Sequence, residues 1–151
     1  MESAMKFSRQ YFLEKSPPEP ERTLFIARHQ SFHGTTLGAL SMGGHKIRRA
    51  LFEPMLLGNV SHVSPCFSYR HQGSETVEVY VARLAAELDQ EFQNVGPSKV
   101  IAFVAEPVVG AVSVILFCLW EHASELTLRN TGSWMRSVRG GLLPGHEGGL
   151  R

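Results

Sequence analysis

Residues 23–41, TLFIARHQSFHGTTLGALS, decide the fold that we predict for this chain. Residues 23–27 are apolar on both faces, which is typical of a buried strand in a parallel sheet. The loop Phe32-His33-Gly34 follows, and the small residues at 35–41 can then form a helix. α/β proteins bind ligands where a strand ends in a loop and opens onto a helix, because free backbone N–H groups point outward there. We therefore expect the functional site in this loop, where the aromatic ring offers a stacking surface and glycine lets the backbone approach a ligand.

A short strand candidate at residues 60–63 and a buried apolar run at residues 100–105 extend the same pattern. Helical periodicity at residues 2–15 and 74–95 places helices around them. The order helix, strand, helix, strand, helix, strand predicts an α/β fold in which helices cover a parallel sheet. Ligands of such sheets bind outside the carboxyl ends of the strands. Glu106, which closes the last apolar run and precedes a proline, is therefore a second candidate for the site.

Both long helices are expected to bury one apolar face. In the first, the inner residues recur every three or four positions: Ala4, Met5, Phe7, Ser8, Tyr11 and Phe12. In the second, Ser74 is the expected N-cap, and the apolar stripe consists of Val77, Val81, Leu84, Leu88 and Phe92. Residues 64–73 between the apolar runs are expected to be loop. The basic residues 45–49 are expected to form one solvated helical turn.

Length and composition limit the classes of protein that fit. The 151 residues suit one domain, and a formal net charge of +1 gives no reason to expect nucleic acid or an anionic membrane as a partner. Cys66 and Cys118 match no metal spacing, so we expect reduced thiols in an intracellular protein. The N-terminus lacks the order of a signal peptide, and the longest apolar run, 112–120, is shorter than the roughly 20 residues that span a bilayer. These features predict a cytoplasmic protein, with a mitochondrial location left open.

The character of the chain changes after Ala111. Six of the 14 glycines lie in the last twenty residues, and neither helical nor strand periodicity continues there. We therefore predict two parts: an ordered domain over residues 1–111 and a disordered, unrelated tail over residues 112–151.

Residues 2–111 resemble the class III aminotransferases, which are pyridoxal-phosphate enzymes of the type I fold. The resemblance rests on four stretches in the family's order and at its spacing: ESAMKFSRQY at 2–11, SFHGTTLGALS at 31–41, FEP at 52–54 with residues 60–70, and VAEPVVG at 104–110. It implies part of the three-layer parallel sheet of the type I large domain. It also implies pyridoxal 5'-phosphate as cofactor, an amino donor with a keto-acid or aldehyde acceptor as substrates, and a homodimer as the family's assembly.

The resemblance also implies roles for four residues. Phe32 would lie flat against the pyridine ring, with His33 behind or beside it. Gly34 would let the chain turn close to the cofactor, and Glu106 would place a carboxylate near the ring. We expect these four residues to bind the cofactor, and we assign no catalytic residue.

Three groups of the family pattern have no counterpart in the sequence. The phosphate-binding Gly-Ser loop would precede Glu2, and the aspartate at the pyridine nitrogen and the cofactor-binding lysine would follow Glu106. The only aspartate is Asp89, and the lysines are Lys6, Lys15, Lys46 and Lys99. We therefore expect no covalent cofactor capture and no transamination by this chain alone. We hypothesise that a frameshift, a retained intron or a wrong gene boundary produced this pattern.

Other functions stay open beside an aminotransferase. The chain could be a non-catalytic remnant or dimerisation partner of an intact homologue, or part of an enzyme for another pyridoxal-phosphate reaction. A metal site is disfavoured, because His29 with His33, and His62 with Cys66, each lack a third ligand. A hydrolase is disfavoured because Ser31 and His33 have no aspartate to orient them and no nucleophile-elbow motif.

Overall fold

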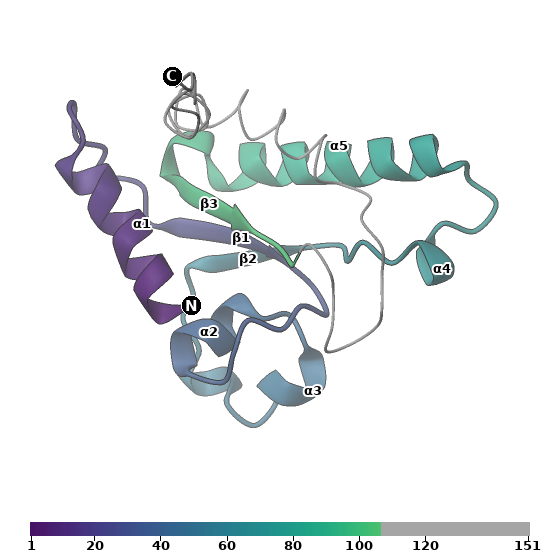
Figure 1. Cartoon of the computed structure of the whole chain (residues 1–151), viewed down its shortest axis with the longest axis horizontal. Helices are drawn as coiled ribbons and strands as arrows, with labels where there is room; N and C mark the ends of the chain where they lie inside the picture. Colours follow the sequence, from purple (N-terminus) through teal and green to yellow (C-terminus); the bar gives the residue numbers. More distant parts are fainter. Residues whose placement is uncertain (107–151) are drawn as a thin grey trace, which may run out of the picture.

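A computed structural model describes residues 1–106, and the sheet at its centre is parallel throughout (Figure 1). Its strands are β1 (Leu24–Arg28), β2 (Val60–Val63) and β3 (Val100–Val104), in the order β2-β1-β3. Ala27 of β1 pairs with His62 on one side and with Val104 on the other. The middle three residues of β1 are buried, which explains why this strand is apolar on both faces. The predicted parallel α/β sheet is confirmed.

Helices cover both faces of this sheet. The longest are α1 (Glu2–Glu14) and α5 (Val77–Val95), and the shorter ones are α2 (Leu37–Met42), α3 (Lys46–Arg49) and α4 (Ser68–His71), with 3-10 turns η1 (Glu53–Met55) and η2 (Pro97–Lys99). Alternate residues of β1 face opposite layers. Phe25 and Ala27 join the cluster with α1, whereas Ile26 joins the cluster with α5. The described residues therefore form three layers, with the sheet between the two long helices (Figure 1).

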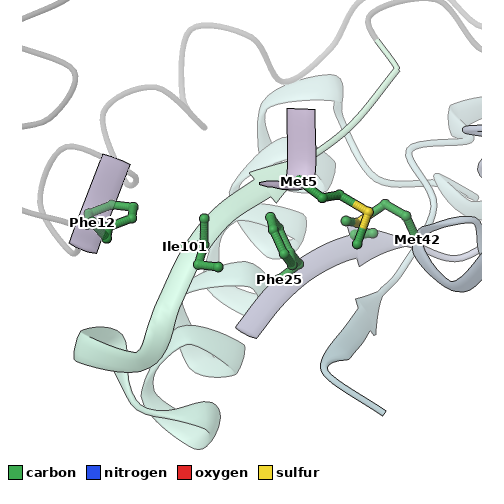
Figure 2. Close-up of a cluster of buried hydrophobic side chains, with 6 residues drawn as sticks. Met5, Phe12, Phe25, Met42 and Ile101 are labelled. Carbon is green, nitrogen blue, oxygen red and sulfur yellow. The ribbon is translucent and has the colours of Figure 1, made fainter. Parts of the chain in front are cut away.

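The layer on the α1 side is built from large apolar side chains. Met5 and Phe12 of α1 pack with Phe25, Met42 and Ile101 (Figure 2). The prediction for the inner face of α1 was wrong for three residues: Ala4 is exposed, Phe7 is 69% exposed and Tyr11 is 40% exposed. Met5 and Phe12 are seven positions apart, which is two helical turns. The buried face is therefore a narrow stripe, and Phe7 and Tyr11 lie outside it.

The layer on the α5 side follows the predicted stripe except at its start. Val81, Leu84, Leu88 and Phe92 are buried, but Val77 is 47% exposed. The N-cap is Thr76 rather than Ser74, and its hydroxyl accepts a hydrogen bond from the Val79 N–H at 3.4 Å. Tyr80, which the stripe omitted, is fully buried, and its hydroxyl accepts the Phe67 N–H at 2.9 Å.

Two segments between the strands also bear on the predictions. The stretch expected to be loop at 64–73 contains the single turn α4, so that expectation was wrong at residues 68–71. The basic segment forms α3, a single turn without buried residues, as expected. Among residues 1–106 the longest helix is too polar to cross a membrane. The predicted boundary at Ala111 and the predicted disordered tail lie outside the described residues.

Candidate functional site

The predicted site lies at the carboxyl edge of the sheet. The loop Phe32-His33-Gly34 follows the central strand β1, and Glu106 follows its neighbour β3. The carboxylate oxygen Oε1 of Glu106 accepts a hydrogen bond from the backbone N–H of Phe32, with a donor–acceptor distance of 2.5 Å. The fold thus brings together two groups that are 74 residues apart in the sequence. Parallel strands end at the same edge, which is why their order alone could predict this meeting.

The Phe32 side chain is half-buried and has a cationic neighbour. The guanidinium carbon of Arg48 lies 4.5 Å from the centre of the Phe32 ring, which is cation–π geometry. Among residues 1–106, the Arg48 side chain has no hydrogen bond or ion pair. From the sequence, Arg48 is one member of a basic stretch at 45–49, and no local pattern relates it to an aromatic ring sixteen positions earlier.

His33 contributes an unpartnered polar atom. Its ring nitrogen Nε2 is buried and, within the described residues, has no hydrogen-bond partner. Burial lowers the pKa of His33, while the nearby Glu106 carboxylate acts in the opposite direction. The imidazole is therefore neutral at neutral pH, with a donor or acceptor available for a group outside the described residues.

The start of the loop is fixed by backbone contacts to the segment after α2. Gln30 adopts a left-handed conformation with φ of 61°, and its N–H donates to the Gly44 carbonyl at 3.0 Å. Gly44 N–H in turn lies 3.2 Å from both the carbonyl and the hydroxyl oxygen of Ser31. A Cβ at Gly44 would lie 2.4 Å from the Arg28 carbonyl oxygen, so only glycine fits. The loop that carries Phe32 thus begins from a tightly held turn.

The end of the loop also depends on glycine. Gly34 has a φ of 132°, and a Cβ placed there would lie 3.0 Å from the Cβ of Ala39 in α2. Any other residue would be strained and would push the loop away from α2. The loop with Phe32 and His33 is therefore fixed at both ends by close packing, of Gly44 against the backbone of Arg28 and of Gly34 against Ala39.

The helix α2 behind the loop is capped at its carboxyl end by other elements. Arg49 donates to the carbonyls of Leu40, Ser41 and Gly43 at 3.3, 2.8 and 2.7 Å. His62 lies 3.2 Å from the Met42 carbonyl. A cation at this end interacts favourably with the helix dipole. Arg49 is thus a structural residue, in contrast to its neighbour Arg48.

The described residues offer part of what a pyridoxal-phosphate site needs. They offer an aromatic ring, a carboxylate beside it and an unpartnered imidazole nitrogen, and these fit one wall of such a site. Asp89 lies on α5 rather than at the carboxyl edge of the sheet, so it does not meet the Phe32 loop. None of the four lysines stands where the family's lysine would, after Glu106. These residues therefore fit stacking against the cofactor ring and hydrogen bonding to it, but not covalent attachment of the cofactor.

Metal ligation receives no support from the histidines. His29, whose pairing with His33 as metal ligands is disfavoured from the sequence, stacks on His62 with ring centres 5.4 Å apart. Burial lowers the pKa of both rings. Within residues 1–106, no group of three or more His, Cys, Asp or Glu side chains is placed to bind a metal ion.

Comparison with solved structures defines the class of protein. An (S)-enantioselective omega-transaminase from Thermomicrobium roseum superposes with a TM-score of 0.79 and 32% identity, over 87% of this chain and 29% of that one. The omega transaminase of Pseudomonas jessenii in complex with PMP superposes with a TM-score of 0.77 and 28% identity, over 85% of this chain and 28% of that one. The described residues thus have the fold of one part of an omega-transaminase.

Sequence comparison identifies the family within that class. The family profile "Aminotransferase class-III" matches residues 1–117. An aminotransferase of Gibberella zeae is 60% identical over 113 residues, and a gamma aminobutyrate transaminase of Solanum lycopersicum is 39% identical over 100 residues. The chain belongs to the class III aminotransferase family. The alignments cover 74% and 64% of this chain but only 22% and 18% of the two relatives, so the chain spans about a fifth of their length.

Proposed function

We propose that this chain forms the ring-stacking wall of a class III aminotransferase's pyridoxal-phosphate site. The observation that carries the proposal is the 2.5 Å contact between the Phe32 N–H and Glu106 Oε1. It joins an aromatic ring and a carboxylate at the edge where parallel sheets bind ligands. Family membership supports pyridoxal phosphate as the cofactor, and so does the structural similarity to an omega transaminase solved in complex with PMP.

Each residue of the wall has a distinct task in this proposal. The Phe32 ring supplies a flat apolar surface that orients the pyridine ring and excludes water from one side. Glu106 holds the Phe32 backbone in place and directs negative charge toward the bound ring. His33, with its unpartnered nitrogen, donates or accepts one hydrogen bond, and Gly34 keeps Cβ atoms away from the cofactor.

The reaction itself needs groups that the described residues lack. When bound, pyridoxal phosphate withdraws electrons from the substrate carbon and so makes amino-group transfer possible. We propose that this chain alone does not attach the cofactor covalently and does not transaminate. The amino donor, the keto-acid or aldehyde acceptor and a second subunit belong to the same proposal through the family.

Non-covalent binding tests the stacking role. Pyridoxamine phosphate (PMP) has no aldehyde, so its binding does not depend on a lysine. Titration of the full chain, followed by the fluorescence of the ligand, should give saturable binding that Phe32→Leu weakens roughly threefold to tenfold, because the leucine removes an aromatic contact of about 0.5–1.5 kcal/mol. Phe7→Leu is the matched control, since Phe7 is 69% exposed on α1. Equal affinity of the two variants would contradict the role of Phe32.

Covalent capture is tested separately. The full chain is incubated with pyridoxal phosphate, reduced with borohydride and mapped by peptide mass spectrometry. We expect scattered, low labelling of surface lysines and no turnover with amino donors. Stoichiometric labelling of one lysine together with turnover would overturn the proposal that the chain is inactive by itself.

A further inference from the structure

The helix α2 begins with a cap that comes from a distant part of the chain. The Thr36 side chain makes no capping hydrogen bond to the helix. Glu2, at the start of α1, takes this role: its Oε1 accepts from the Thr36 hydroxyl at 2.5 Å and from the Ala39 N–H at 3.0 Å. A carboxylate at this end satisfies an otherwise free N–H and interacts favourably with the helix dipole. The contact spans 34 to 37 residues of sequence.

Gly38 leaves the room that the Glu2 carboxylate occupies. A Cβ at position 38 would lie 2.5 Å from Glu2 Oε2 and 2.7 Å from Oε1. Both distances are well below van der Waals contact, so an alanine at this position would displace the carboxylate. Glycine in a helix is less favourable than alanine, and its presence here is explained by the space that Glu2 needs.

Ala39 connects this cap to the cofactor-binding loop. Its N–H is held by Glu2, and its Cβ is the atom that a Cβ at Gly34 would meet at 3.0 Å. Ala39 therefore contacts both the capping carboxylate of Glu2, through its N–H, and the loop at Gly34, through its Cβ. At the far end of α2, Arg49 holds three carbonyls, so the position of this six-residue helix is set at both ends by charged side chains.

We propose that Glu2 is a positioning residue of the site, whose carboxylate fixes the first turn of α2 and, through Ala39, the place of the loop Phe32-His33-Gly34. This proposal rests on the proposed function only in the experiment that measures PMP binding. The Thr36 hydroxyl and the Ala39 N–H lower the pKa of Glu2, and the N-terminal ammonium of Met1 acts in the same direction. The carboxylate is therefore charged at neutral pH.

The test uses amide NMR on the isotopically labelled full chain at pH 7. Glu2→Gln should shift the amide signals of Ala39 and Gly34 and speed hydrogen exchange at Ala39 about fivefold, as expected for a weakened N-cap. Glu14→Gln is the matched control, because it removes the same charge from the other end of α1, where the carboxylate accepts from Gln10 of the same helix. The control should leave both signals unchanged.

A second variant separates positioning from general loss of stability. Gly38→Ala should produce the same shift at Gly34 as Glu2→Gln, and the double variant Glu2→Gln/Gly38→Ala should add little to either. Non-additivity of this kind is expected for two changes that remove one contact. The proposal would be overturned if the Gly34 amide signal did not shift in either variant. It would also be overturned if the shift in the double variant equalled the sum of the shifts in the two single variants.

PMP affinity then relates the inference to the proposed function. Glu2→Gln should weaken PMP binding several-fold relative to Glu14→Gln if the loop moves as described. If the Gly34 signal responds but PMP binds neither the wild type nor the variants, the proposed function fails and the positioning role stands. If PMP binds both variants equally and the Gly34 signal does not move, the positioning role fails and the proposed function stands.

Discussion

At the residue scale, the site depends on one backbone N–H and one carboxylate. Phe32 N–H would otherwise lie partly buried at the end of β1, and an unsatisfied group of this kind costs about 1–3 kcal/mol. Glu106 satisfies it from the neighbouring strand. The sequence predicted both residues as candidates, because each follows an apolar run. It could not predict their hydrogen bond, or the approach of Arg48 to the ring, since these depend on side-chain packing between segments distant in sequence.

His33 gives a prediction for pH dependence at the same scale. Burial lowers the pKa of His33, and likewise of His29 and His62, below the ordinary value of 6.5. The unfolded chain therefore binds protons at these sites more readily, and the free energy of unfolding falls as the pH drops through and below 6.5. The urea midpoint should be lower at pH 5.5 than at pH 7.5, and His33→Gln should reduce this difference. His71→Gln, at an exposed position, is the control and should leave it unchanged. An identical pH difference in the His33 variant and the wild type would contradict the assignment.

At the element scale, the apolar runs and helical periodicity predicted most helices and strands to within two or three residues. The errors occur where tertiary contacts override local pattern. Tyr80 interrupts the apolar stripe of α5 with a polar atom, yet it is fully buried because Phe67 N–H donates to its hydroxyl. Phe7 fits the period of α1 but lies beyond the face that β1 and β3 cover. Glu2 could not be identified as a cap from local sequence, since the helix that it caps begins 35 residues later.

A substitution in α5 tests the layer behind the sheet. Phe92 is fully buried with Ile26, Val63 and Val100, so Phe92→Ala should cost about 3–5 kcal/mol in the free energy of unfolding. Val79→Ala, in the same helix but 53% exposed, should cost well under 1 kcal/mol. Urea denaturation of both variants measures the difference. Similar costs at the two positions would show that α5 does not pack on the sheet as described.

At the scale of the whole molecule, residues 1–106 contain a sheet of three parallel strands, and the chain spans about a fifth of the length of its relatives. The parallel sheet between helices was predicted because strands that alternate with helices favour this arrangement, whereas the strand order β2-β1-β3 was not. The exposure of large apolar side chains on α1 and α3 could not be predicted in the same way; these side chains are Phe7, Leu13 and Ile47. Hydrophobic periodicity identifies an apolar face but does not tell whether another part of the protein covers it. The boundary proposed near Ala111 stays a prediction.

The most direct test of the account asks whether the cofactor ring lies on Phe32. Intermolecular nuclear Overhauser effects are measured between PMP and the labelled full chain. We expect transfer from the pyridine ring protons and methyl group to the Phe32 ring, with weaker transfer to His33 and none to Phe7. Transfer to other aromatic residues, with none to Phe32, would show that the ring and the Glu106 carboxylate do not form a pyridoxal-phosphate wall.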